Sequence, residues 1–353
     1  MTIDLSFFLS ELVSNPLLAV VTILNIGVII VNGATDAPNA IATSVSTRAM
    51  KPRHAILMAA ICNFAGLLLI SLVSSAVAHT IFTMVDFGGD AHQSIIALMA
   101  AMVAIIVWGV VTWWFGIPTS QSHSLIAGLT GAAIALQGSF DAINGAEWIK
   151  VIYGILLSTL LGFGLGWVFF KIIAKVCARA NRQRANRFFR VAQVFAGAGV
   201  AFMHGAQDGQ KFMSIFILAI TLVAGMGGSD EAASLVLPLW LMVFCALNMG
   251  LGTAVGGERI IKSVGMDMVK LESVQGFAAS ASTFFSLLLA TFGGLPVSTT
   301  HTNTTAIMGV GAARNPKTVK WGIAIDMVKT WVLTFPGCGL LGFLCAKLFL
   351  IIL

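Results

Sequence analysis

The chain has 353 residues, of which 58% are hydrophobic and only 10% are charged. Soluble domains carry about 25% charged residues, so this composition excludes an ordinary soluble domain and is typical of a polytopic membrane protein. The formal net charge of +6 is no sign of nucleic-acid binding, because the basic residues lie in short clusters between apolar runs. Such clusters are typical of cytoplasmic loops.

The first candidate span covers residues 16–42 and is interrupted at residues 33–38, where Asp36 lies between Gly33 and Pro38. A helix that crosses a bilayer needs about 20 apolar residues. An aspartate inside such a helix is costly, so Asp36 is predicted to mark a functional site. The end of this span is predicted to face the cytoplasm, because basic residues follow it: Arg48, Lys51 and Arg53.

Residues 54–82 form a second span, which leads to a loop that contains Asp86 and Asp90 and no basic residue. We expect this loop to be external.

A hairpin comes next. Residues 94–115 are apolar, residues 116–124 form a polar tip, and residues 125–136 have a small-residue helical pattern. The loop beyond contains Asp141 and Glu147 and is again predicted to be external. Because both flanks face the same side, the segment must enter the membrane, turn and return. Irregular backbone is tolerated there only where protein or a water-filled cavity surrounds it.

Residues 148–173 then cross inward to a strongly basic segment without any acidic residue. In a short loop, such a run indicates the cytoplasmic side of the membrane. The alternative interpretation is a patch that binds nucleic acid or lipid headgroups. The basic residues are Lys171, Lys175, Arg179, Arg182, Arg184, Arg187 and Arg190.

The second half begins like the first. Residues 191–222 form a span with a second Asp-centred motif, and a loop with Asp230 and Glu231 follows. Residues 235–254 return to the cytoplasmic side, which is again marked by basic residues: Arg259, Lys262 and Lys270.

The second half also ends like the first. Residues 273–311 form a hairpin that turns at residues 294–302, and residues 321–353 form a last span that ends outside. The hairpin opens to the cytoplasm, because basic residues follow it: Arg314, Lys317 and Lys320.

The two halves thus share the order broken helix, span, hairpin, span, in opposite orientations. We predict an all-α polytopic membrane protein with an inverted-topology repeat, broken helices and two re-entrant helical hairpins. The first repeat covers residues 1–175, a basic cytoplasmic linker covers residues 176–190, and the second repeat covers residues 191–353. Transporters built in this way bind their substrate between the repeats, near the membrane midplane.

The two hairpin tips align, each with a proline followed by polar side chains and a helix start. Free N–H groups and the positive dipole end of a helix bind anions, and hydroxyls add donors that do not trap the anion. Alternatively, these side chains only cap helices or form bonds between helices. The predicted anion-binding residues are Thr119, Ser120, Gln121, Ser122, Ser298, Thr299 and Thr300.

The two Asp-centred motifs offer hard oxygen ligands, which suit a small cation. Helix breaks would add free backbone carbonyls to them. The alternative is a buried aspartate that caps a half-helix. The predicted cation-binding or coupling residues are Asn32, Asp36, Asn39, Gln207 and Asp208.

Three further polar residues admit two interpretations each. Lys211 either forms a salt bridge with Asp208, three residues earlier, or acts as a tethered cation that replaces one ion site. His123 and His301 either relay protons or cap and donate to a neighbour. A similar pair in the last span is interpreted as structural: Asp326 and Lys329.

Three motifs carry a resemblance to a known family. They are Gly33-Ala34-Thr35-Asp36-Ala37-Pro38-Asn39-Ala40, the second copy with His204-Gly205, Asp208 and Gln210-Lys211, and the second tip Leu295-Pro296-Val297-Ser298-Thr299-Thr300-His301. Over nearly its whole length the chain resembles the PiT family of inorganic phosphate transporters, whose duplicated signature is Gly-Ala-Asn-Asp-x-Ala-Asn-Ala. Thr35 and Gln207 depart from it by replacing the asparagine before each aspartate, and Pro38 replaces an alanine.

The resemblance implies a secondary carrier of inorganic phosphate in a prokaryotic inner membrane, driven by Na⁺ or H⁺ through rocking of the repeats. It implies phosphate on the hairpin tips, Na⁺ at Asp36 and Asp208, and a homodimer. We expect no other cofactor and no nucleic-acid partner. The choice between Na⁺ and H⁺, and between free and metal-bound phosphate, stays open.

Sulfate or another oxyanion is the alternative substrate. Phosphate at neutral pH still carries a proton that it can donate to a carboxylate, and sulfate does not, so Asp36 and Asp208 favour phosphate. An enzyme is disfavoured because the chain has no Gly-x-Ser-x-Gly motif. The ATP-binding Gly-x-x-x-x-Gly-Lys-Ser/Thr motif is also absent, which disfavours a primary pump. A channel would show transport that does not saturate.

Overall fold

The computed structural model describes residues 4–88, 90–115, 117, 119–223, 237–255, 261 and 269–353. Within these residues the structure is almost entirely helical, and β-pairing is limited to one isolated bridge between Val85 and Ile143. The α-helices are α1 (Leu5–Ser14), α2 (Pro16–Thr35), α3 (Ala37–Ser46), α4 (Pro52–Val73), α5 (Ala76–Phe82), α6 (Ala91–Trp114), α7 (Gln121–Gln137), α8 (Gly145–Val176), α9 (Arg182–Val223), α11 (Leu239–Val255), α13 (Ser273–Phe292), α14 (Thr299–Arg314) and α15 (Trp321–Ile352).

The described residues include six helical segments that are long and apolar enough to cross a membrane, which confirms the predicted all-α polytopic class. The long helix α9 is not among them, because its polar run from Gln207 to Lys211 lowers its hydropathy. The six segments are Pro16–Ser46, Pro52–Val73, Ala91–Trp114, Gly145–Val176, Ser273–Phe292 and Trp321–Ile352.

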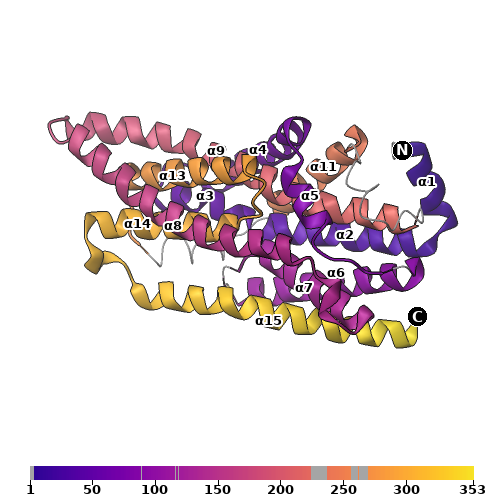
Figure 1. The fold of residues 1–353 in the computed structure, drawn as a ribbon. Coiled ribbons are helices and arrows are strands. Elements are labelled where there is room, and N and C mark those ends of the chain that lie inside the picture. Colours follow the sequence, from indigo (N-terminus) through magenta and orange to yellow (C-terminus); the bar gives the residue numbers. More distant parts are fainter. Residues whose placement is uncertain are drawn as a thin grey trace.

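The bundle is elongated, with both ends of the chain at one end and the turn between α8 and α9 at the other (Figure 1). The hairpin of α6 and α7 lies towards the end with the termini, and the hairpin of α13 and α14 lies towards the opposite end. This placement agrees with two hairpins that enter from opposite sides. The inverted repeat and the depth of the hairpins in a membrane stay predictions.

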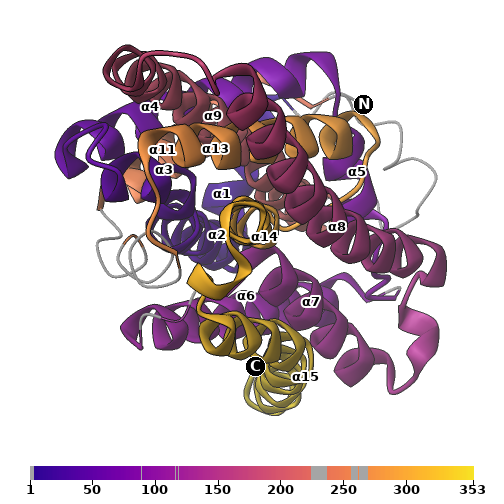
Figure 2. The ribbon, with the colours of Figure 1, turned by 90° about the vertical axis from the view of Figure 1, so that its left-hand side faces the viewer.

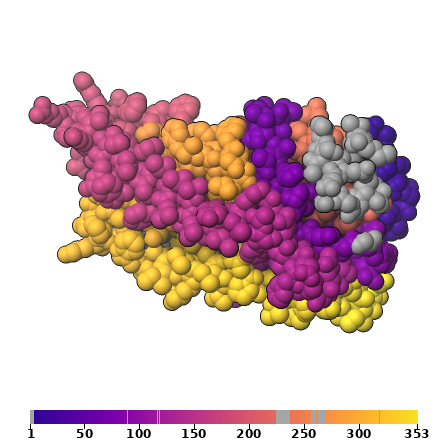
Figure 3. All heavy atoms as spheres, viewed as in Figure 1, coloured from indigo at the N-terminus to yellow at the C-terminus, as the bar shows by residue number. Residues whose placement is uncertain are grey.

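The second helix of each hairpin packs against the final helix of the other half of the chain. Helix α7 packs along α15, and α14 packs along α8. Helices α7 and α14 are almost wholly buried, whereas α8 and α15 run along the outside of the bundle (Figures 2 and 3). The polar tips therefore lie inside protein, which satisfies the condition for irregular backbone at membrane depth.

The predicted break in the first span is present, but it is shorter than predicted. Asp36 alone separates α2 from α3, with φ −96° and ψ −40°, and its N–H still donates to the Asn32 carbonyl. Pro38 explains the interruption, because proline has no N–H and its ring clashes with the carbonyl four residues earlier.

The predicted break in the second span is wrong. Helix α9 continues without interruption through residues 204–211. The second motif has Gln210 at the position of Pro38, so no proline removes a backbone donor there. Its glycines serve close packing instead: a Cβ on Gly205 would meet the backbone of Asn63 in α4. The free carbonyls that a second break would have supplied are consequently absent from this part of α9.

Two other boundaries differ from the prediction. The second span is divided into α4 and α5, because the helix ends at Val73 and restarts at Ala76. The predicted linker over residues 176–190 is mostly helical, because α9 begins at Arg182. Several predicted features lie outside the described residues: Pro118 and the loop positions Asp230, Glu231, Arg259 and Lys262.

Candidate functional site

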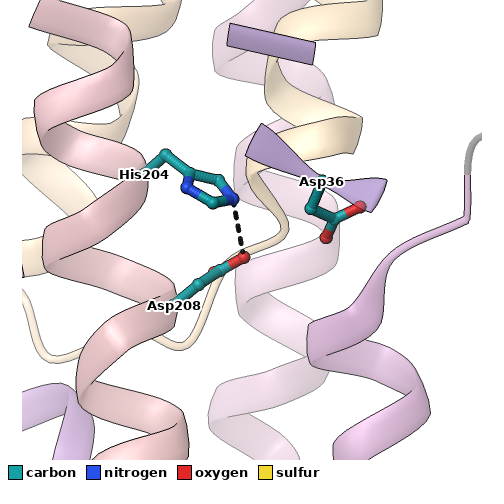
Figure 4. Close-up of side chains that lie close together, drawn as sticks. All are labelled: Asp36, His204 and Asp208. Atoms are coloured by element: carbon teal, nitrogen blue, oxygen red, sulfur yellow. Dashed lines mark ion pairs between the residues drawn. The ribbon is translucent and has the colours of Figure 1, made fainter. Parts of the chain in front are cut away.

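Two buried carboxylates form the centre of the site. Asp36 at the α2–α3 break is 1% exposed, and Asp208 in α9 is 0% exposed. Figure 4 shows both carboxylates beside the ring of His204, and one ligand atom from each of the three residues lies within 4.8 Å of the others. Intramembrane carboxylates are costly to bury, so their partners determine what the site can do.

Asp36 accepts hydrogen bonds from both hairpin tips. Its Oδ2 accepts the backbone N–H of Gln121 at 3.0 Å, and its Oδ1 accepts the hydroxyl of Thr300 at 3.0 Å. Gln121 is the first residue of α7 and Thr300 lies in the first turn of α14, so one carboxylate meets the N-terminal ends of both tip helices. Such helix starts are positive dipole ends, and they stabilise an anion.

Asp208 receives a different set of partners. Its Oδ1 accepts the Ser122 hydroxyl at 3.1 Å and lies 2.8 Å from the Lys211 ammonium. Its Oδ2 accepts the Asn32 amide at 3.2 Å and lies 3.3 Å from Nε2 of His204. The salt bridge favoured for Lys211 is confirmed. Asp326 and Lys329 also pair, at 3.2 Å on the exposed face of α15.

The two aspartates exchange partners between the halves of the chain. Asp36 belongs to the first half and is bonded by Thr300 of the second half, whereas Asp208 belongs to the second half and is bonded by Ser122 of the first half. Ser122 and Thr300 occupy aligned positions of the two tips. The predicted polar elements therefore meet at one place between the halves.

Asn39 joins the first motif to the second tip. Its amide donates to the Thr300 hydroxyl at 2.8 Å, and its backbone carbonyl accepts the amide of Asn303 at 2.7 Å. Asn303, on α14, was not predicted as part of the site. Its signal in the sequence was weak, because an asparagine one turn after a helix start also suits ordinary packing between helices.

The side chain of Gln207 donates its hydrogen bonds to residues other than the two aspartates. Its side-chain nitrogen donates to the hydroxyl of Thr291 at 2.9 Å and to the carbonyl of Leu295 at 3.3 Å. These hydrogen bonds therefore connect α9 to the end of α13 and to the turn that follows α13, and neither bond reaches Asp36 or Asp208. Its cation-binding role stays a prediction.

The serines at the tips cap the tip helices. The hydroxyl of Ser120 accepts the N–H of His123 at 3.3 Å, and that of Ser298 accepts the N–H of His301 at 3.1 Å. Thr119 donates to Thr112 in α6 at 3.0 Å. The capping interpretation is thus correct for both serines, which leaves other tip atoms for a ligand.

Among the predicted anion-binding residues of the tips, two buried polar groups have no partner among the described residues: the side-chain nitrogen of Gln121 and the hydroxyl of Thr299. A buried donor without a partner is costly, so such groups call for a ligand or water. Gln121 and Thr299 occupy aligned positions, directly after the capping serines.

His123 and His301 pack as aromatic rings. Their centroids lie 4.5 Å apart in an edge-on arrangement, and His301 stacks on Trp331 of α15 at 3.7 Å. None of their ring nitrogens has a hydrogen-bond partner among the described residues. Within that part of the chain the two side chains neither cap a helix nor donate to a neighbour, and a proton-relay role stays a prediction.

His204 was missed as a neighbour of Asp208. Its Nδ1 lies 2.8 Å from the Asn63 side-chain oxygen, and Asn63 donates to Thr253 at 3.0 Å. The sequence did contain a signal, because residues four apart share a helix face. Because a helix break was expected at this motif, the i, i+4 spacing of His204 and Asp208 was not interpreted as a contact on one helix face.

The comparisons with known proteins agree on one family. The family model described as "Phosphate transporter family" matches residues 32–342. A Bacillus subtilis protein named "Probable low-affinity inorganic phosphate transporter" is 40% identical over 88% of this chain and 91% of its own length. A Rhizobium meliloti protein of the same name is 39% identical over 89% of this chain and 91% of its own length.

A solved structure has the same fold. It is named "The sodium-dependent phosphate transporter", and it covers 96% of this chain and 100% of its own with a TM-score of 0.85 and 22% identity. At that identity the likeness shows the fold alone. The family match over most of the chain shows more: this protein is a multi-pass membrane protein and a transporter rather than an enzyme, and it belongs to the phosphate transporter family.

Proposed function

We propose that this chain is a secondary active carrier that moves inorganic phosphate together with Na⁺ or H⁺ by alternating access in a prokaryotic inner membrane. The observation that carries this proposal is the exchange of partners at the centre, where Thr300 bonds Asp36 and Ser122 bonds Asp208. Each carboxylate thereby ties one half of the chain to the other. A change in the charge of either carboxylate would alter how the halves hold together, which is what coupling requires.

The cation is assigned to the carboxylate oxygens of Asp36 and the oxygens around them. The side-chain oxygens of Asn32 and Asn39 are buried and lack a partner among the described residues. Amide and carboxylate oxygens suit a hard cation such as Na⁺. The structurally similar carrier is named sodium-dependent, which supports Na⁺ over H⁺. When bound, the cation would supply positive charge beside Asp36.

Phosphate is assigned to the hairpin tips. Helix α7 begins at Gln121 and α14 begins at Thr299, and both residues hold a donor without a partner among the described residues. In this structure Asp36 accepts the first backbone N–H of α7, so the carboxylate occupies a donor that an arriving anion would otherwise use. Neutralisation of Asp36 by a cation would free that donor, which gives a physical reason for binding the two solutes together.

The site is closed on all sides in this structure. Asp36, Asp208, Gln121 and Thr300 are each less than 5% exposed. A carrier must pass through such a closed state between its inward-open and outward-open forms. We therefore assign this conformation to the occluded state of the cycle, with the two halves rocking about the central site.

Uptake of radiolabelled phosphate into proteoliposomes tests this function. Separately imposed Na⁺ and pH gradients identify the coupling ion, and excess sulfate tests selectivity. We expect uptake that saturates with phosphate, responds to one of the two gradients and resists sulfate. Sulfate that suppresses uptake at equal concentration would overturn the choice of phosphate, and uptake indifferent to both gradients would overturn coupling. Cross-linking in the membrane tests the expected homodimer.

A further inference from the structure

Lys211 is buried in a cage of oxygen atoms. The side chain is 0% exposed, and its Nζ lies 2.8 Å from the Asp208 carboxylate, 2.7 Å from the Ser122 hydroxyl and 2.6 Å from the Val297 carbonyl. These partners come from α9 and from both hairpin tips. One cation thus connects the three polar elements at the interface between the halves.

The neighbours of the Lys211 side chain fit an ammonium group. The Val297 carbonyl and the Asp208 carboxylate can only accept, and the Ser122 hydroxyl already donates to Asp208. All three neighbours of Nζ are therefore acceptors, and each needs an N–H. An ammonium has three N–H donors, whereas a neutral amine has two. The three neighbours of Nζ therefore match the three donors of an ammonium.

The cage has the composition of an alkali-cation site. A carboxylate, a hydroxyl and a backbone carbonyl are hard oxygen ligands of the kind that hold Na⁺. In this chain the ammonium of Lys211 fills that position.

The corresponding cluster of the first half contains no such cation among the residues described. Asn39 stands at the position of Lys211, and Asp36 accepts hydrogen bonds from neutral donors only, the Gln121 N–H and the Thr300 hydroxyl. Among the described residues, the salt bridges of the site are made to Asp208 and none is made to Asp36. The side-chain oxygen of Asn39 has no hydrogen-bond partner among them either. The first cluster thus has a carboxyl group without an ion-pair partner and an orphaned oxygen, and both point to a diffusible cation.

We propose that Lys211 is a permanently bound, covalently tethered cation that takes the place of a diffusible ion at Asp208. The coupling ion is then taken up on the Asp36 side alone. This inference rests on the proposed cation-coupled transport. It predicts that removal of the ammonium creates one additional site for a small cation, whichever ion the unmodified chain uses.

A purely structural salt bridge is the competing explanation, and Lys211→Asn separates the two. This substitution copies the residue of the first half and leaves the oxygens of Asp208, Ser122 and Val297 in place. A structural bridge predicts a less stable protein with unchanged cation dependence. A tethered cation predicts that Na⁺ restores the lost stability, because Na⁺ enters the vacated cage.

The first measurement needs no transport. Thermal unfolding of the detergent-purified full chain is followed against NaCl, with choline chloride holding ionic strength constant. The dependence of stability on ion concentration gives the number of ions bound. We expect this number to rise by about one from the unmodified chain to Lys211→Asn. Lys211→Asn with Asp208→Asn is the matched control, and it should not show the rise, because the carboxylate of the cage is gone.

An unchanged Na⁺ dependence in Lys211→Asn would overturn the proposal. If Lys211→Asn does not fold, Lys211→Gln, which keeps more of the side-chain length, takes its place with the same expected rise. If neither variant folds in choline chloride, purification in NaCl decides: recovery of folded protein in NaCl but not in choline supports the proposal, and failure in both salts overturns it.

The second measurement counts charge. The reversal potential of phosphate flux in proteoliposomes gives the number of charges moved with each phosphate, and we expect about one more positive charge in Lys211→Asn. An equal number of charges moved per phosphate in both proteins would contradict the proposal. If the unmodified chain takes up no phosphate, the proposed function fails, while the thermal measurement still tests the role of Lys211.

Discussion

The clusters around Asp36 and Asp208 contain similar sequence motifs, and two differences between these motifs matter for the site. Pro38 interrupts the helix at Asp36, whereas Gln210 lets α9 run on past Asp208. Asn39 adds no charge, whereas Lys211 adds an ammonium at 2.8 Å from its aspartate. The first cluster therefore has a helix break and a carboxyl group bonded by neutral donors, and the second has a continuous helix and an internal ion pair.

This difference indicates a division of labour at the centre. A carboxylate bonded only by neutral donors can gain and lose a cation during a cycle, because none of those hydrogen bonds is an ion pair that must first break. A carboxylate paired with a buried ammonium is held in one state, because breaking a buried pair costs about 3–5 kcal/mol. We therefore propose Asp36 as the exchanging side of the site and Asp208 as the permanent side.

The largest effect on phosphate uptake is expected from Asp36→Asn. This change removes the exchangeable charge, and we expect phosphate uptake to fall at least about tenfold, since loss of one charge-assisted hydrogen bond costs about 1.5–3 kcal/mol. Proteoliposome uptake measures the loss, and the amount of purified protein shows whether the variant inserts. Asp208→Asn should reduce uptake as well. Full activity in either variant would contradict the proposed coupling.

Lys211→Met should destabilise the protein by about 3–5 kcal/mol in NaCl-free buffer, because Asp208 then remains buried without its counter-charge. Lys329→Met is the matched control, since Lys329 pairs with Asp326 at the same spacing on an exposed surface. There we expect a change below about 1 kcal/mol. Denaturant unfolding of the purified proteins measures both values. Equal losses would show that burial of Lys211 has no energetic consequence.

Gly33→Ala and Gly205→Ala test what the two motifs share. An added Cβ would meet the backbone of Gly252 and Thr253 in α11 at the first position, and that of Asn63 in α4 at the second. Overpacking costs about 1–3 kcal/mol, so both variants should unfold at lower denaturant concentration. Gly164→Ala is the control, since no described atom lies within 4 Å of its added Cβ. A loss in the control of similar size would rule out close packing as the cause.

The smallest effects are expected at the aligned hydroxyls of the tips. Thr300→Val leaves Asp36 with the Gln121 N–H alone, whereas Ser122→Ala leaves Asp208 still paired with Lys211. We expect about 1–3 kcal/mol for Thr300→Val and less for Ser122→Ala, since an acceptor that keeps a charged partner loses less. The concentrations of coupling ion and phosphate at half-maximal uptake measure the difference. The reverse order would argue that Asp208 is the exchanging side.

Much of this arrangement was predictable because it follows from local patterns. Apolar runs of span length predicted the long helices, which the structure confirms, and the basic clusters predicted two chain ends on one side, with which the fold agrees. The salt bridge of Lys211 and Asp208 was also predicted, since residues three apart on a helix are neighbours.

Other features were not predictable, because they depend on contacts between distant segments. The backbone N–H of Gln121 carries no side-chain signal, yet it donates to Asp36. The partners Ser122 for Asp208 and Thr300 for Asp36 cross from one half to the other. The helix break predicted at Asp208 is wrong, because the second motif resembles the first but lacks its proline, and α9 continues there without interruption.

By itself, the sequence determined the helical membrane class, the Asp-centred motifs and the tips, because hydropathy, proline and charge act within a few residues of their position. Only the tertiary structure decided which donors each carboxylate receives and how the two sides differ in charge. The physical reason is burial: once both aspartates are inside the bundle, the few groups packed against them determine whether each charge is free or paired.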